Sequence, residues 1–120
     1  MPRGVYTFPE VAVVGTTEAE LNAAEKSYKV GKFDFIASGK AKASGKIEGF
    51  VKVITNENDV LIGAAVVGAH ATELIQPLTL AVEWGMTAKQ AGNAIYPHPT
   101  MCEAIMEALH DVHGLSIHKP

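Results

Sequence analysis

A histidine held between two prolines, with a carboxylate five residues later, is the part of this sequence best suited to proton transfer. The segment reads Tyr96-Pro97-His98-Pro99-Thr100-Met101-Cys102-Glu103. Proline fixes its own φ at about −65° and biases the preceding residue toward an extended conformation, so His98 has little conformational freedom. A carboxylate beside an imidazole fixes its tautomer and stabilises the imidazolium, as in a general base. The spacing indicates His98 as a candidate proton acceptor and donor, oriented by Glu103.

Both residues also have ordinary structural interpretations. Thr100-x-x-Glu103 has the pattern of a capping box, in which the glutamate accepts a hydrogen bond from the cap residue's N–H group. His98 is equally compatible with an ordinary loop histidine. We also expect one of the two X–Pro bonds, preferably His98-Pro99, to be cis, because cis costs only about 0.5–1 kcal/mol before proline. Taken alone, the segment leaves these alternatives open.

Three other features could carry chemistry, and each has a simpler interpretation. His110-x-x-His113 places two imidazoles on one helix face near His118, but no carboxylate or thiol completes a ligand set by spacing, so no metal site is expected. Cys102 lies in a first helical turn that could lower a thiol pKa, yet a packed or idle thiol is the simpler interpretation. Trp84 ends an apolar stripe and is interpreted as a core or interface residue rather than a cofactor platform.

The elements around these residues predict an α+β domain, with a mostly antiparallel sheet and helices packed on it. Apolar or alternating runs predict strands at residues 11–14, 28–35, 50–55 and 60–67, and the last two are expected to form a hairpin around the polar turn 56–59. Gly63 and Gly68 suggest a bulge or a close backbone approach within the second strand of that hairpin.

Helical signals alternate with these strands. Thr17-x-x-Glu20 predicts a capped short helix reaching about residue 24, and Thr87-x-x-Gln90 predicts another brief helix. A helical apolar stripe over residues 74–82 ends at Gly85 and contains Pro77, where a kink is expected. The last helix is predicted from about residue 101 to residue 113. Its apolar face comprises Ala104, Ile105, Ala108, Leu109 and Val112.

Size and composition limit what the chain can do alone. Its 120 residues suffice for one domain, taken as residues 1–120, with a hydrophobic fraction of 48% and a mean hydropathy of +0.13. A net charge of −3 and a pI near 5.9 give no basic footprint for nucleic acid. No apolar run reaches membrane-spanning length and nothing resembles a signal peptide, so no membrane partner is expected. A single cysteine excludes an internal disulfide and fits a reducing compartment.

Four ordered motifs make nearly the whole chain, from about residue 2 to residue 114, resemble one family. They are Val5-Tyr6-Thr7-Phe8-Pro9-Glu10-Val11-Ala12-Val13-Val14-Gly15, Ile62-Gly63-Ala64-Ala65-Val66-Val67-Gly68 preceded by Gly49-Phe50-Val51-Lys52-Val53, Ala71-Thr72-Glu73-Leu74-Ile75, and His98-Pro99-Thr100 with Glu103-Ala104. Together they are similar to the C-terminal interface domain of the dihydrolipoamide dehydrogenases, which are flavin-dependent pyridine nucleotide–disulfide oxidoreductases.

The resemblance implies a function that the chain shares with a larger protein. Such enzymes oxidise dihydrolipoamide with NAD+ through FAD and a redox disulfide. Their interface domain dimerises the enzyme and presents the residues corresponding to His98 and Glu103 to the active site of the other subunit. This sequence has no G-x-G-x-x-G fingerprint and no second cysteine. FAD and NAD are therefore expected in absent N-terminal domains of the full-length enzyme and not on this chain, which should be inactive alone.

The implied partners are a second copy of the chain, the N-terminal FAD and NAD domains, and the lipoyl domains of 2-oxo acid dehydrogenase complexes. We expect a two-fold dimer through the sheet face and the final helix, and a cytoplasmic location (the mitochondrial matrix in a eukaryote). Tyr96 stands where the family often has a second histidine, and Cys102 stands where serine is usual. The alternatives are a stand-alone dimerisation module without catalysis, or the same domain of a mercuric or glutathione reductase.

Overall fold

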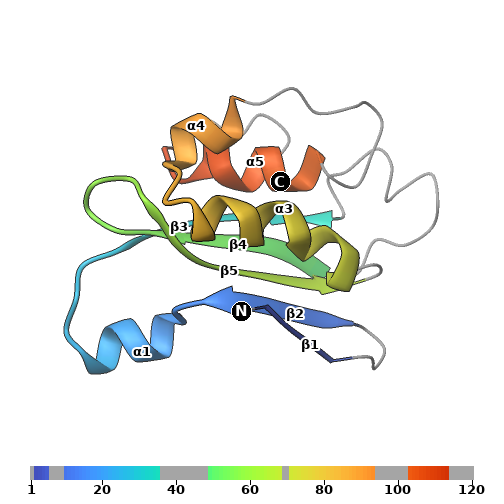
Figure 1. Cartoon of the computed structure of the whole chain (residues 1–120), viewed down its shortest axis with the longest axis horizontal. Helices are drawn as coiled ribbons and strands as arrows, with labels where there is room; N and C mark the ends of the chain where they lie inside the picture. Colours follow the sequence, from blue (N-terminus) through green and yellow to red (C-terminus); the bar gives the residue numbers. More distant parts are fainter. Residues whose placement is uncertain (1, 6–9, 36–48, 69–70, 94–102, 114–120) are drawn as a thin grey trace.

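One five-stranded antiparallel sheet organises the domain in the computed structural model, which describes residues 2–5, 10–35, 49–68, 71–93 and 103–113. The strand order is β1-β2-β5-β4-β3 (Figure 1). The strands are β1 (Arg3–Val5), β2 (Val11–Gly15), β3 (Lys29–Asp34), β4 (Gly49–Thr55) and β5 (Leu61–Gly68). The helices are α1 (Glu18–Ala23), α3 (Ala71–Glu83), α4 (Ala88–Gly92) and α5 (Glu103–Asp111). The predicted α+β class is confirmed.

Helices α3, α4 and α5 cover one face of this sheet and α1 lies on the other side. Helix α3 packs on β2 and β5, α5 packs on β3 and β4, and α4 packs beside α5 (Figure 1). Alternate strand residues point toward these helices because side-chain direction reverses at every position of a strand. The buried strand residues on this face include Ala12, Val14, Phe33, Val51, Val53, Ala64 and Val66. The core therefore lies between the sheet and the α3–α5 layer, and α5 is one of the elements that enclose it.

The caps predicted from local sequence patterns are present in the structure. Both capping boxes are present, at Thr17 with Glu20 and at Thr87 with Gln90. Gly85 adopts a φ of 64° after α3. There the Gly85 N–H donates to the carbonyl of Val82 and the Met86 N–H donates to the carbonyl of Ala81, the pair of bonds that closes a Schellman motif. In each case the donor and the acceptor lie within a few residues of each other in the sequence, so the sequence pattern alone is enough to predict the cap.

The structure also departs from the sequence expectations. Strand β1 was not predicted, and it is only three residues long. The hairpin register shifts between Ile54, which pairs with Gly63, and Thr55, which pairs with Leu61, so Ile62 is the extra residue of β5 and the irregularity lies beside Gly63. Gly63 also marks a close backbone approach, since a Cβ there would meet the carbonyl oxygen of Thr16 at 2.0 Å. Pro77 lies inside α3 as predicted.

Two apolar side chains at the C-terminal end of α3 are exposed: Leu80 lies within the helix and Trp84 directly follows it. One of them corrects an expectation. Trp84 is 81% exposed and Leu80 is 48% exposed. The core alternative for Trp84 is therefore wrong, and the interface alternative stays. In the part of the chain that the structure describes, no helix combines the length and apolar character needed to cross a membrane.

Candidate functional site

The candidate site is carried by the segment that joins α4 to α5. His98 and the two flanking prolines lie outside the described residues, as do Cys102, the Thr100 cap and the X–Pro bond expected to be cis. Glu103 is the first residue of α5, and only its backbone is described. The contact between His98 and Glu103 therefore stays a prediction. What the structure does describe is the support at both ends of the segment, Gly92 and Asn93 before it and α5 after it.

Helix α5 is fixed to the sheet by close packing. Ala104, Ile105, Ala108 and Leu109 are each at most 1% exposed, which confirms the predicted apolar face. At Gly31 on β3 the helix backbone comes so near that an added Cβ would lie 2.1 Å from the carbonyl oxygen of Ala108. The Lys32 backbone N–H also donates to Oδ2 of Asp111 at 2.9 Å. Glu103 thus begins a helix whose body has little room to move.

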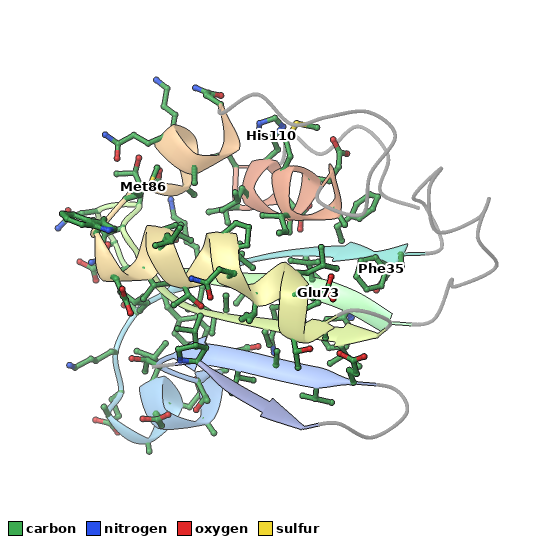
Figure 2. The ribbon with its side chains drawn as sticks, turned by 45° about the vertical axis from the view of Figure 1, so that its right-hand side comes forward. Phe35, Glu73, Met86 and His110 are labelled. Atoms are coloured by element: carbon green, nitrogen blue, oxygen red, sulfur yellow. The ribbon has the colours of Figure 1, made fainter. Side chains whose placement is uncertain are left out.

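A histidine connects α5 to the end of α4. His110 Nε2 lies 2.9 Å from the carbonyl oxygen of Gly92, and Figure 2 shows His110 between the two helices. A Cβ at Gly92 would meet the His110 ring at 2.8 Å, so the glycine permits this approach. The end of α4 and the last turn of α5 are therefore joined directly, 18 residues apart in sequence but adjacent in the fold.

Asp59 joins the same two helices from the turn between β4 and β5. Its Oδ2 accepts a hydrogen bond from the Lys89 backbone N–H at 3.1 Å, and its carbonyl oxygen accepts one from the Ala88 N–H at 2.9 Å. Its Oδ1 lies 2.8 Å from Nε2 of His113. That pair has the distance of an ion pair but not the alignment of a hydrogen bond, and Oδ1 has no other partner among the described residues. Sequence reasoning treated residues 56–59 only as a polar turn and missed this role.

The two histidines near the end of α5 therefore have separate structural partners. His110 contacts Gly92, and His113 contacts Asp59. Within the described ranges, no group of three or more histidine, cysteine, aspartate or glutamate side chains could hold a metal ion. Sequence reasoning also missed that Glu107, one turn after Glu103 on α5, is only 1% exposed. Glu107 has an interaction partner within the fold, as a buried polar side chain requires.

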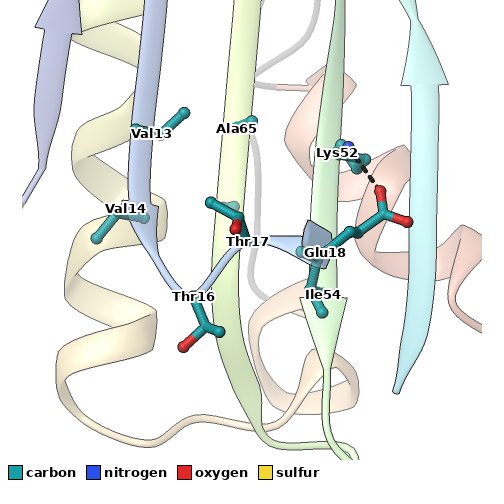
Figure 3. Close-up of a pocket in the computed structure, with 9 residues that line it drawn as sticks. Val13, Val14, Thr16, Thr17, Glu18, Lys52, Ile54 and Ala65 are labelled. Carbon is teal, nitrogen blue, oxygen red and sulfur yellow. Dashed lines mark hydrogen bonds and ion pairs between the residues drawn. The ribbon is translucent and has the colours of Figure 1, made fainter. Parts of the chain in front are cut away.

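A second polar feature lies on the far side of the sheet, beside α1. A hollow of about 60 Å³ there is lined by Val13, Val14, Thr16, Thr17, Glu18, Lys52, Ile54, Ala64 and Ala65. At its edge Lys52 Nζ donates to Oε1 of Glu18 at 2.6 Å (Figure 3). This hydrogen bond from Lys52 lowers the pKa of the Glu18 carboxyl below its ordinary value, against the opposing effect of burial. The hollow is too small for a flavin or a nicotinamide, because cofactor pockets span roughly 300–1,000 Å³.

Comparison with known proteins agrees with this architecture. Residues 1–109 match the dimerisation domain of the pyridine nucleotide-disulphide oxidoreductases. The chain is 49% identical over 119 residues to a dihydrolipoyl dehydrogenase of Thermus scotoductus, covering 98% of this chain and 26% of that protein. It is 43% identical over 109 residues to a mitochondrial dihydrolipoyl dehydrogenase of Caenorhabditis elegans, covering 90% of this chain and 22% of that protein.

Solved structures give the same result. The crystal structure of LpdA from Mycobacterium tuberculosis superposes with a TM-score of 0.86 at 29% identity, covering 92% of this chain and 24% of that one. The flavoprotein disulfide reductase RclA from Escherichia coli, at 22% identity and a TM-score of 0.84, shares the fold. The chain thus spans about a quarter of the length of the curated relatives it matches. Its sequence match and its fold together show that it belongs to the pyridine nucleotide-disulphide oxidoreductase family, as the dimerisation domain.

Proposed function

We propose that this chain is the interface domain of a dihydrolipoamide dehydrogenase, in which it pairs two subunits and supplies His98 and Glu103 as an acid–base pair. The observation that carries the proposal is the 49% identity to a dihydrolipoyl dehydrogenase over 98% of the chain. The motif also lies on a segment whose two flanking helices are joined to each other and to the sheet, and catalytic loops are commonly positioned by such a rigid scaffold.

The proposed chemistry is removal of a proton from a thiol of dihydrolipoamide. Only the thiolate is a good nucleophile, and a free thiol has a pKa of about 8.5, so a base is required near neutral pH. His98 accepts the proton and holds it as an imidazolium, and the thiolate then attacks the redox disulfide of the other subunit. Glu103 orients the ring and stabilises its positive charge. In this proposal His98 acts on the substrate's sulfur and Glu103 acts through His98. Neither residue takes part in the electron transfer.

FAD and NAD belong to other parts of the proposed enzyme. The hollow beside α1 is too small for either group, and the sequence has no dinucleotide fingerprint. We assign both cofactors to FAD and NAD domains outside this chain. The lipoyl domains of 2-oxo acid dehydrogenase complexes are the proposed source of the dihydrolipoamide. The proposed location is the cytoplasm, or the mitochondrial matrix in a eukaryote.

Dimerisation requires an exposed surface that a second subunit can cover. The apolar side of α5 is already buried within the chain, so only its outer side is available to a partner. The C-terminal end of α3 instead exposes Leu80 and the following Trp84, four positions apart and on the same side, since the Trp84 N–H still donates to the Leu80 carbonyl. Large exposed apolar side chains of this kind mark interaction surfaces. We therefore propose that the outer side of α3 contributes to the two-fold contact, beside the sheet face and final helix favoured from the sequence.

Turnover of the full-length protein that carries this chain tests the catalytic part. His98→Gln should lower turnover with dihydrolipoamide by about 10²–10⁴-fold, which is the usual contribution of a positioned general base. Oxidation of NADH by an artificial acceptor should change little, because no thiol is deprotonated in that reaction. Glu103→Gln should cost less, because it removes orientation and charge but keeps the base. A His98→Gln enzyme that keeps its dihydrolipoamide turnover would show that the domain only dimerises the protein.

A further inference from the structure

We propose that α1 is a strap over the far face of the sheet that opens and closes while the α3–α5 layer stays packed, and that the ion pair between Lys52 and Glu18 holds it closed. The strap comprises residues 16–28, which carry α1 from the end of β2 to the start of β3 (Figure 1). Helices α3, α4 and α5 lie on the opposite face of the sheet. The strap can therefore leave the sheet without uncovering the main core.

The apolar contact between the strap and the sheet is small. Leu21 is the buried residue of α1, and Ile54 of β4 lines the hollow beside that helix. The two side chains are 5% and 3% exposed, yet neither belongs to the cluster of buried residues that forms the main core. Each of the other described helices packs extensively on a strand or on another helix, whereas α1 has no contact of that extent. Burial of apolar surface therefore stabilises the attachment of α1 much less than that of the other helices.

A charged contact compensates in part for this small apolar contact. Lys52 Nζ lies 2.6 Å from Oε1 of Glu18, the first residue of α1, and joins the helix to β4 (Figure 3). Within the strap itself, the Tyr28 hydroxyl donates to Oδ1 of Asn22 at 2.9 Å, so α1 and the chain that leads to β3 are held together. The strap is thus connected internally and is tied to the sheet by the Lys52–Glu18 pair.

The closed strap is also under strain. Helix α1 has six residues, and a helix that short is not stable alone in water. At its end the Glu25 N–H donates to the carbonyl of Asn22 and the Lys26 N–H donates to the carbonyl of Leu21, at 3.1 and 3.0 Å. These bonds require Glu25 to adopt a φ of 55°, a left-handed conformation that is unfavourable for residues other than glycine. Opening of the strap releases this strain.

Opening uncovers a defined part of the sheet. The hollow of about 60 Å³ loses the wall formed by Thr17 and Glu18, so Ile54 and Ala65 become accessible beside a lysine without its partner (Figure 3). Segments with few buried apolar contacts open at a lower free energy than the core of a protein. The strap should therefore open many times for each unfolding of the sheet.

Amide hydrogen exchange of the full-length protein tests this independence, with peptides from the strap (residues 17–26) and from β4 (residues 50–55) analysed by mass spectrometry. The strap should be protected at least about tenfold less than β4 and should respond little to low urea, because its opening exposes little surface. Val53→Ala truncates a fully buried side chain on the other face of β4. It should lower the protection of β4 by about tenfold or more and leave the strap unchanged. Equal protection and equal urea dependence of the two peptides would overturn the proposal.

Two matched lysine variants test the ion pair. Lys32 pairs with Lys52 across the β3–β4 ladder and so lies on the same face, but its ammonium contacts Asp34 instead of α1. Lys52→Met should lower the protection of the strap about threefold, the effect of a partly exposed ion pair, and Lys32→Met should not. Glu25→Gly relieves the left-handed strain and should raise this protection about threefold. Equal responses to the two lysine changes, or faster exchange of the strap in Glu25→Gly, would contradict the proposed closure.

Discussion

The close approach of α5 to Gly31 makes a strong prediction about stability. In Gly31→Ala the new Cβ would lie 2.1 Å from the Ala108 carbonyl oxygen, 2.7 Å from Val112 Cγ2 and 2.8 Å from the Val112 nitrogen. Two of these three atoms are backbone, so a rotamer change cannot relieve the overlap. The end of α5 must move away from β3 by about 1 Å to reach an ordinary contact, which is the overpacking that costs about 1–3 kcal/mol.

Opposing effects can be estimated for the same substitution. Alanine is favoured over glycine inside a strand by about 0.5–1 kcal/mol, which offsets part of the overlap. The Lys32–Asp111 hydrogen bond adjoins the contact and is weakened when α5 shifts, at about 1 kcal/mol. The net expectation is a loss of about 2 kcal/mol in the free energy of unfolding. For a domain of this size that corresponds to a fall in Tm of roughly 8 °C.

Thermal unfolding of the chain, followed by circular dichroism, measures this change. Gly85→Ala is the control, because its φ of 64° penalises a side chain while nothing lies within 4 Å of the added Cβ. It isolates the backbone penalty, about 1 kcal/mol, from steric overlap. If the Tm of Gly31→Ala lies within about 2 °C of that of the parent, α5 can move away from β3 without a loss of stability. The rigid support described for Glu103 would then be wrong.

Three further predictions concern an ion pair, a cap and an exposed surface. The pKa of Glu18 is lowered in the folded chain, so its pair with Lys52 stabilises the fold above the unfolded carboxyl pKa of about 4.3 and loses this contribution as pH falls through the lower folded pKa. Lys52→Met should therefore cost at most about 1 kcal/mol at pH 7 in urea unfolding, and the difference from the parent should shrink toward pH 3. Thr87→Ala should cost about 1 kcal/mol in the same assay, through loss of the α4 cap, and an unchanged midpoint would deny the cap any role. Replacing Leu80 and Trp84 by serine should weaken self-association at least tenfold in sedimentation experiments with little change in Tm, and an unaltered dimer would place the contact elsewhere.

Where a structural feature depends on neighbouring residues, the sequence was enough to predict it. The two threonine capping boxes, the glycine after α3 and the buried face of α5 all follow from spacings of a few residues. The hairpin was predicted for the same reason, because its two β-branched runs are separated only by a polar turn.

Caps supplied from distant parts of the chain could not be predicted in this way. Glu10, just before β2, accepts hydrogen bonds from the backbone and side chain of Thr72 in the first turn of α3. Asp59 does the same for α4. Both assignments require knowing which strand lies under which helix, and that is a property of the sheet order. Strand β1 was missed because three residues carry too little periodicity to distinguish a strand from a loop.

The candidate site also has features that the sequence predicted and features that it did not. The motif around His98 was identified from its residue types, and its assignment to a family came from four motifs together. The contacts of α4 and α5 that involve Asp59, Gly31 and His110 were not identified, because each joins residues remote in the sequence.

The strand order has a consequence for how the domain folds. Strands β3, β4 and β5 pair with their sequence neighbours, whereas β2 pairs with β5 across the intervening chain, as Val13 with Ala65. Contacts between distant residues form late because loop closure costs entropy before any contact compensates for it. We therefore expect the β3–β4–β5 meander to be structured in the folding transition state and the β2–β5 pairing to form afterwards. Val53→Ala should slow folding, whereas Val14→Ala, which truncates an equally buried β2 side chain, should mainly speed unfolding in stopped-flow experiments.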